Sequence, residues 1–158
     1  MNKVPMTKAG YKNLQAELKK LINEERPAII AAITEARGHG DLSENAEYQY
    51  AKEQQSLIET KILELENIVV QAEVIDISKL SGKEIMFGAT VTIEDNETEE
   101  QSTYQIVGEY ESDIENKKIS INSPMARGLI GKSKNDVVEI NSPKGIKFYT
   151  VVSVKFQK

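Results

Sequence analysis

The sequence predicts an α+β protein of two domains: a long antiparallel α-helical coiled-coil hairpin over residues 1–75, with an acidic tip at 38–47, and a globular domain with an antiparallel sheet over residues 76–158. Two observations lead to this prediction. Before residue 76, apolar residues recur at helical spacing. After it, β-branched residues alternate with polar ones, and six of the nine glycines occur there.

The composition narrows the classes of function. The 158 residues include no Cys and one His, which excludes disulfides, thiolate zinc sites, a cysteine nucleophile and a His-rich metal centre. The formal net charge of −5 argues against a protein that grips duplex DNA through its phosphates. No stretch approaches the ~20 apolar residues of a membrane span, and the N-terminus lacks the apolar region of a signal peptide. We therefore expect a cytoplasmic protein without membrane contact.

The first arm of the hairpin shows an apolar stripe that changes register. Its first part steps by 3, 4 and 3 residues through Tyr11, Leu14, Leu18 and Leu21. The stripe then continues, displaced by one residue, through Ile22, Ile29, Ile33 and Ala36. Pro27 lies close to this shift, and an interior proline removes one helical hydrogen bond. The pattern predicts a long helix that bends near Pro27.

The second arm shows a more regular stripe. Steps of 3 and 4 residues connect Tyr48, Ala51, Gln55, Ile58, Ile62, Leu65, Val69 and Ala72. Gly38-His39-Gly40 lies between the arms and allows the chain to reverse. Thr7 and Asp41 are suitable N-cap residues for the two helices. Periodicity alone leaves two interpretations open: a spacer or dimerisation coiled coil, and a probe that carries its tip into a narrow space.

The tip carries two acidic residues three positions apart, Asp41 and Glu44. On the first turn of a helix this spacing resembles a capping box, in which acidic side chains interact favourably with the helix dipole. The same spacing also suits a hard cation, because Mg²⁺ is often bound through one or two carboxylates, with water or phosphates completing its shell. Two carboxylates cannot form a complete cage, so any metal here would be shared with another molecule. The two interpretations are compatible.

The second half reads as strands with one short helix. The expected strands are 89–93, 103–107, 118–121, 136–140 and 148–156, the first two joined by the acidic turn 94–101. A short helix is expected at 125–130, after Pro124. The segment Ala126–Ser133 differs from a P-loop by one residue, but a P-loop requires a glycine-rich loop that feeds a full-length helix in a βαβ unit. No such unit follows, so nucleotide binding is not expected.

Two blocks of sequence carry a family resemblance. The first is the tip, Asp41-Leu42-Ser43-Glu44-Asn45-Ala46-Glu47-Tyr48. The second is Asn122-Ser123-Pro124-Met125-Ala126-Arg127-Gly128-Leu129-Ile130-Gly131-Lys132. Together with Pro5-Met6-Thr7, Gly10 and Leu14, they resemble the bacterial Gre transcript cleavage (transcription elongation) factors over essentially the whole chain. The resemblance is to the GreA type, and it implies an FKBP-like fold for the second domain.

The resemblance implies a function as an accessory factor rather than an enzyme. Members of this family dock their C-terminal domain near the secondary channel of bacterial RNA polymerase and insert the coiled coil. The tip then reaches the active site of a backtracked polymerase, which cleaves the nascent RNA near its 3′ end. The implied partners are the polymerase and the RNA 3′ end, with DNA contacted only indirectly, through the elongation complex. A monomer is expected.

The resemblance also assigns roles to individual residues. Asp41 and Glu44 match the accessory catalytic residues that share a Mg²⁺ with the polymerase, and Ser43 and Glu47 are further tip candidates. Arg37 and Lys52 match a small basic patch that would contact RNA or the channel wall. Its small size favours the GreA type over the more basic GreB type. Arg127 and Lys132 are candidates for polymerase docking.

Alternatives remain open at this point. The chain could occupy the channel and regulate the polymerase without stimulating cleavage, or its second domain could act as an FKBP-like isomerase or chaperone. A coiled-coil adaptor is a further alternative. Gly38 departs from the family pattern, in which a helix former is expected, and glycine costs roughly 1 kcal/mol of helix propensity. This residue leaves open how far the first helix extends.

Overall fold

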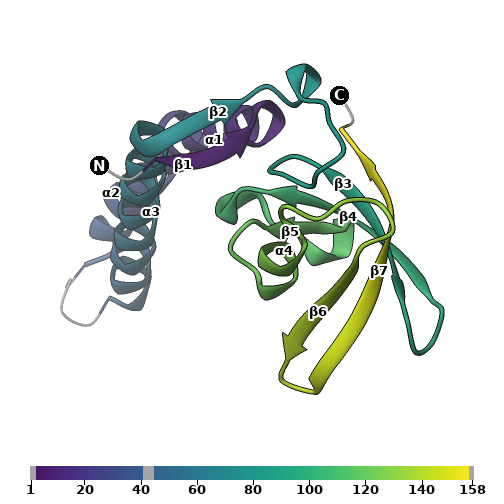
Figure 1. Ribbon diagram of the computed structural model, residues 1–158. Coiled ribbons are helices and arrows are strands. Elements are labelled where there is room, and N and C mark those ends of the chain that lie inside the picture. The colour runs from purple at the N-terminus through teal and green to yellow at the C-terminus, as the bar shows by residue number, and fades with distance from the viewer. Residues whose placement is uncertain (1–2, 41–44, 157–158) are drawn as a thin grey trace. The chain divides into compact units, whose positions relative to one another are not determined.

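A computed structural model describes residues 3–40 and 45–156 of the chain, and its contacts divide it into two units (Figure 1). Tyr11–Gln71 forms one unit, whereas Met1–Gly10 and Ala72–Lys158 together form the other. The helical hairpin and the C-terminal sheet confirm the predicted α+β class. Residues 1–10 and 72–75, which we assigned to the hairpin from the sequence, group instead with the sheet.

The first arm of the hairpin consists of two α-helices joined by one π-helical turn. Helix α1 spans Lys8–Lys20, the π-turn η1 spans Leu21–Glu25, and α2 spans Arg26–Arg37. The N–H of Arg26 donates to the carbonyl of Leu21, five residues earlier. A π-turn inserts one extra residue into the helix, which explains the one-residue displacement of the apolar stripe. Pro27, expected to bend the helix, lies in the first turn of α2, where a missing N–H is tolerated.

The second arm is the helix α3, Ala46–Gln71, which packs against α2. Its buried side chains are Ala51, Ile62, Leu65 and Ile68. These residues follow the predicted stripe, except that Ile68 is more deeply buried than its neighbour Val69. Ala72 does not continue the helix, because the chain enters a strand there. In the described part of the chain, no helix is long and apolar enough to cross a membrane.

Two short strands were not predicted. Strand β1, Val4–Thr7, runs parallel to β2, Ala72–Ile75, with Val4 opposite Ala72. Parallel strands require a long connection, and here the whole helical hairpin provides it. Lys3 and Glu73 add an exposed contact of 4.0 Å between Nζ and Oε2. The two strands bring the ends of the hairpin sequence together.

The second sheet has five strands in the order β5-β4-β3-β7-β6 (Figure 1). Their bounds are β3 Thr90–Asp95, β4 Gln101–Val107, β5 Lys118–Ser120, β6 Val137–Ser142 and β7 Gly145–Lys155. Four adjacent pairs exist, of which β4–β5 is parallel and the others are antiparallel. The sheet is therefore mixed, which corrects the predicted antiparallel sheet. The chain between β4 and β5 contains the 3₁₀ turns η3, Glu109–Glu111, and η4, Ile114–Asn116, and it returns the chain to the same direction.

Helix α4, Pro124–Leu129, contributes to the core of the sheet unit. Ala126 and Leu129 are fully buried, in one cluster with Val138 and Ile140 of β6. The hydroxyl of Ser123 caps the helix by accepting from the N–H of Ala126 at 3.2 Å. The short helix was predicted correctly, and its six residues are fewer than a P-loop helix requires. The remaining short helix is the 3₁₀ turn η2, Ile77–Lys79.

A bidentate ion pair joins the two arms of the hairpin. Nε and Nη2 of Arg26 donate to the two carboxylate oxygens of Glu59 at 2.8 and 2.7 Å. These hydrogen bonds lower the pKa of Glu59 and raise the pKa of Arg26. Because Arg26 directly follows the π-turn, the pair links the two arms beside the register change.

The pair predicts a pH-dependent contribution to stability. The pKa of Glu59 in the folded state lies below its unfolded value of about 4.3. The stabilisation is thus present above that pH and is lost as the pH falls through the folded-state pKa. Glu59→Gln should lower the melting temperature at pH 7, and the difference from the wild type should shrink at pH 3. The exposed Glu64 on the same helix provides the control, Glu64→Gln. A difference that stays constant between the two pH values would contradict the prediction.

Candidate functional site

The first helix arm ends close to the tip. Helix α2 ends at Arg37. Two hydrogen-bonded turns overlap its end: Gly38 N–H donates to Glu35 O, and His39 N–H donates to Ala36 O, each at 3.1 Å. Gly38 has φ −71° and ψ −11°, a conformation open to other residues. The sequence left open how far the first helix extends. In the structure, the α-helix ends at Arg37, one residue before Gly38.

Asn45 closes the other side of the tip. Its Oδ1 accepts the N–H of Tyr48 at 3.1 Å, which makes Asn45 the N-cap of α3. Its Nδ2 donates to the carbonyl of Ala36 at 2.6 Å. Our prediction that Asp41 is the N-cap of this helix is wrong, since the helix begins five residues later, at Ala46. One side chain thus joins the end of α2 to the beginning of α3.

The predicted acidic pair falls in the short connection between Gly40 and Asn45. Asp41, Ser43 and Glu44 lie outside the described residues, so their assignment stays a prediction. Glu47 lies on the first turn of α3 with its side chain 70% exposed. Its Oε2 is 3.0 Å from Nδ1 of His39, on the opposite arm. Glu47 therefore has a contact within the tip, which sequence reasoning did not predict.

The two basic residues predicted near the tip are exposed. Arg37 is the last residue of α2, and Lys52 lies near the beginning of α3. Nζ of Lys52 donates to Oε1 of Gln55 at 3.3 Å. Neither forms an ion pair within the described residues. Both positive charges are thus available to solvent or to a partner.

The predicted docking residues of the sheet unit are also exposed. Arg127 lies on α4, and Lys132 lies in the turn that follows. The backbone of Lys132 is fixed, because its carbonyl accepts from Ile85 N–H at 2.8 Å and its N–H donates to Leu129 O at 3.0 Å. The structure therefore presents both side chains to solvent from ordered backbone.

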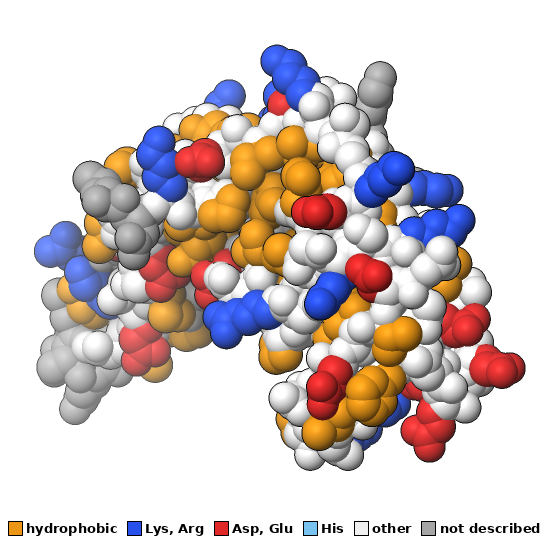
Figure 2. Space-filling model, in the orientation of Figure 1, with side chains coloured by type: hydrophobic (Ala, Val, Ile, Leu, Met, Phe, Trp, Pro, Cys, Tyr) orange, Lys and Arg blue, Asp and Glu red, His pale blue; other side chains and the backbone are white. Residues whose placement is uncertain are grey.

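The acidic turn between β3 and β4 is organised by Asp95. Its Oδ1 accepts from the N–H groups of Glu97 and Thr98 at 2.8 and 3.3 Å, and Oδ2 lies 3.4 Å from Nζ of Lys147. The backbone N–H of Glu97 lowers the pKa of Asp95 most, and the backbone N–H of Thr98 and the ammonium group of Lys147 lower it further. In Figure 2, acidic side chains gather over this turn at the lower right.

The hairpin of β6 and β7 presents apolar side chains that sequence reasoning did not single out. Val137, Ile146 and Phe148 are each about half exposed, at 58%, 57% and 49%. Hydrophobic side chains are visible over this hairpin at the bottom of Figure 2. Alternation in the sequence marks them as strand residues, but it does not show which face of the strands is covered.

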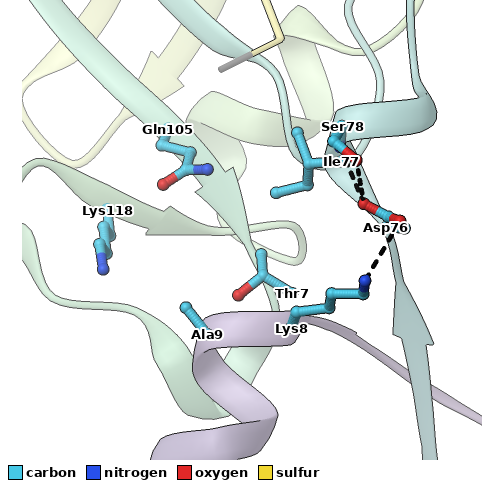
Figure 3. Close-up of a pocket in the computed structure, with 8 residues that line it drawn as sticks. All are labelled: Thr7, Lys8, Ala9, Asp76, Ile77, Ser78, Gln105 and Lys118. Carbon is cyan, nitrogen blue, oxygen red and sulfur yellow. Dashed lines mark hydrogen bonds and ion pairs between the residues drawn. The ribbon is translucent and has the colours of Figure 1, made fainter. Parts of the chain in front are cut away.

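A pocket of about 420 Å³ lies beside the beginning of α1 (Figure 3). Lys8 and Asp76 form an ion pair at 3.3 Å, and both the N–H and the hydroxyl of Ser78 donate to Asp76. The Ser78 hydroxyl, more than Lys8, lowers the pKa of Asp76. Gln105 and Lys118 stand on the opposite side of the pocket. None of the sequence-predicted site residues lines it.

The comparison with known proteins bears on both halves of the chain. Residues 4–74 match the family model described as "Transcription elongation factor, N-terminal", and residues 80–156 match "Transcription elongation factor, GreA/GreB, C-term". The chain belongs to the GreA/GreB family. It is therefore a transcription elongation factor, as the sequence resemblance indicated.

Relatives within the GreA/GreB family align over the whole length. The transcription elongation factor GreA of Caulobacter vibrioides is 55% identical over 156 residues, and that of Beijerinckia indica is 59% identical over 157, with 99% or more of each chain covered. Among solved structures, GreA factor homolog 1 (Gfh1) of Thermus thermophilus aligns with 98% of this chain and 99% of its own, at 29% identity and a TM-score of 0.45.

The geometry of Asn45 predicts that its two hydrogen bonds are separable. Asn45→Ala should remove both and destabilise the hairpin by about 0.5–2 kcal/mol, the usual cost of a lost N-cap. Asn45→Ser should keep the cap on Tyr48 and lose the bond to Ala36. Amide hydrogen exchange at Tyr48 should accelerate in the alanine variant only. Equal acceleration in both variants would contradict the capping role of Asn45.

Proposed function

We propose that this elongation factor acts on backtracked bacterial RNA polymerase by inserting its helical hairpin into the secondary channel and stimulating cleavage of the nascent RNA near its 3′ end. The observation that supports this proposal most is the acidic sequence of the tip, placed at the turn of a two-helix hairpin in a GreA/GreB family member. A two-helix hairpin is narrow, because it has only two helices and one seam between them. It can therefore enter a space that excludes a globular domain.

The tip carries the chemistry of the proposal. Asp41 and Glu44 would hold a Mg²⁺ shared with carboxylates of the polymerase, since Mg²⁺ prefers oxygen ligands and often takes only one or two from each protein. Two carboxylates match a site completed by the partner. When bound there, Mg²⁺ would lower the pKa of a water molecule and neutralise charge on the phosphate.

The remaining tip residues would position this pair. Asn45 fixes the chain directly after Glu44 by bonding to both helices. The contact of Glu47 with His39 ties the first turn of α3 to the opposite arm, and Ser43 is a further candidate for contact in the channel. Arg37 and Lys52 would face RNA phosphates or the channel wall with their exposed positive charges.

The sheet unit would bind the polymerase near the entrance of the channel. Arg127 and Lys132 are candidates for this contact, because both are exposed on ordered backbone. The protein would act as a cytoplasmic monomer, without strong binding to duplex DNA. RNA cleavage would occur at the active site of the polymerase, and the factor would be no nuclease by itself.

Arrested elongation complexes with labelled RNA test the proposal. In the presence of Mg²⁺, the wild-type protein should release short 3′ fragments and allow elongation to resume. The double variant Asp41→Ala/Glu44→Ala should reduce cleavage by at least about 100-fold, as expected for a lost catalytic ligand, while its affinity for the polymerase persists. Glu64→Ala, which changes an exposed acidic residue in the C-terminal half of α3, is the control and should cleave like the wild type.

The outcomes separate the alternatives. Cleavage that persists in the double variant would contradict the role of the acidic pair. Binding to the polymerase without stimulation by the wild type would show a channel-occupying regulator. Cleavage of naked RNA without the polymerase would overturn the accessory role.

A further inference from the structure

The carboxylate of Glu111 accepts three hydrogen bonds at the beginning of α1. Oε2 of Glu111 accepts from the N–H of Thr7 and from the N–H of Gly108, each at 2.9 Å. Oε1 accepts from the hydroxyl of Thr7. Thr7 and Glu111 are 104 residues apart in the sequence. The loop that follows β4 therefore bonds directly to the residue at which the first helix arm begins.

Thr7 continues this network into the helix. Its Oγ1 accepts from the N–H of Gly10 at 3.0 Å, which confirms Thr7 as the predicted N-cap of α1. Its hydroxyl proton then points to Glu111, so one hydroxyl both caps the helix and binds the carboxylate. Thr7 is only 6% exposed, although it is polar. Burial of this polar residue is compatible with stability because its hydroxyl and N–H are both satisfied.

Two glycines make the close approach feasible. A Cβ at Gly10 would overlap the carboxylate of Glu111. A Cβ at Gly108 would overlap the carbonyl oxygen of Pro5 in β1. Gly108 and Glu111 also bond through their backbones, with Glu111 N–H donating to Gly108 O at 3.0 Å. Four segments, namely β1, the first turn of α1, Gly108 and η3, thus meet around one acidic side chain.

We propose that Glu111 is a positioning residue that fixes the first turn of α1 for insertion of the hairpin. Residues 8–10 of α1 group with the sheet, whereas α1 continues without interruption from Tyr11 into the helical unit. The Glu111 network therefore lies where the first arm passes from one unit to the other. The inference rests on the proposed function, in which the sheet unit binds the polymerase and the hairpin must deliver the tip.

The charge and shape of the carboxylate both matter for this role. Glu111 lies at the N-terminus of α1, where a negative charge interacts favourably with the helix dipole. An ionised carboxylate accepts at both oxygens, which matches three donors and no acceptor. Gln has nearly the same shape, but its NH₂ group would face at least one of these donors. The substitution should therefore weaken the network without changing the side-chain volume.

Hydrogen exchange tests the network in the isolated protein. Glu111→Gln and Thr7→Val should accelerate exchange of the Gly10 amide about 10-fold or more, because a tenfold change corresponds to about 1.4 kcal/mol, the size of one lost hydrogen bond. Thr7→Ser keeps the hydroxyl and should exchange like the wild type. Glu115→Gln, an exposed residue four positions from Glu111, is the charge-matched control. Unchanged exchange in Glu111→Gln would overturn the proposed network.

Cleavage kinetics test the positioning role. At saturating factor, Glu111→Gln and Thr7→Val should stimulate cleavage about 10- to 100-fold less than the wild type, since small misplacement of reacting groups has effects of this size. The concentration for half-maximal stimulation should change less than threefold, because neither docking candidate, Arg127 or Lys132, takes part in the hydrogen bonds of the network. Thr7→Ser should restore the rate.

The outcomes distinguish this inference from the proposed function. Wild-type rates in Glu111→Gln would overturn the positioning role and leave the proposed function intact. A rise in the half-maximal concentration with an unchanged maximal rate would also overturn it, since that result shows a docking or stability effect. If the wild type itself does not stimulate cleavage, the proposed function fails, while hydrogen exchange still decides whether the Glu111 network exists.

Discussion

The helical unit depends on one constraint: two antiparallel helices bury only a single narrow seam. Each side chain in that seam therefore contributes a large share of the packing. The apolar stripe of each arm must face the other arm along the whole hairpin. The sequence breaks the heptad pattern between Leu21 and Ile22, and the π-turn restores the register by adding one residue. The bidentate pair of Arg26 and Glu59 joins the arms beside this turn. This exposed ion pair adds a modest polar connection to the packing of the seam.

Two side chains, one in each unit, bond to two separate segments at once. At the tip, Asn45 binds the end of α2 and the beginning of α3. In the sheet unit, Glu111 accepts from Thr7, directly before α1, and from Gly108. These contacts would suit the proposed function, in which the tip residues act at the active site of the polymerase without a core of their own around them.

Prediction from the sequence succeeded where a pattern is local. The stripes from Tyr11 to Ala36 and from Tyr48 to Val69 predicted the two arms, and alternation predicted the strands of the C-terminal sheet. The predicted N-cap of α3 was wrong, because two nearby residues are equally suitable as caps. Asp41 and Asn45 are both good N-caps, and the choice of Asn45 follows from its second bond to Ala36, a contact between different segments. The direction of β5 was missed for a similar reason, since a three-residue strand pairs either way until the sheet decides.

By itself, the sequence determined the α+β class, the family, and the acidic pair proposed to act at the tip. These properties reside in periodicity, in residue type and in two blocks of adjacent residues. Tertiary structure alone decided the pairing of β1 with β2, the mixed sheet, and the meeting of Thr7 with Glu111. The first and the last join segments far apart in the chain, and in all three the residues involved are too few to form a pattern. The Glu111 network is the clearest case, because its partners lie 104 residues apart and only folding brings one carboxylate to three donors.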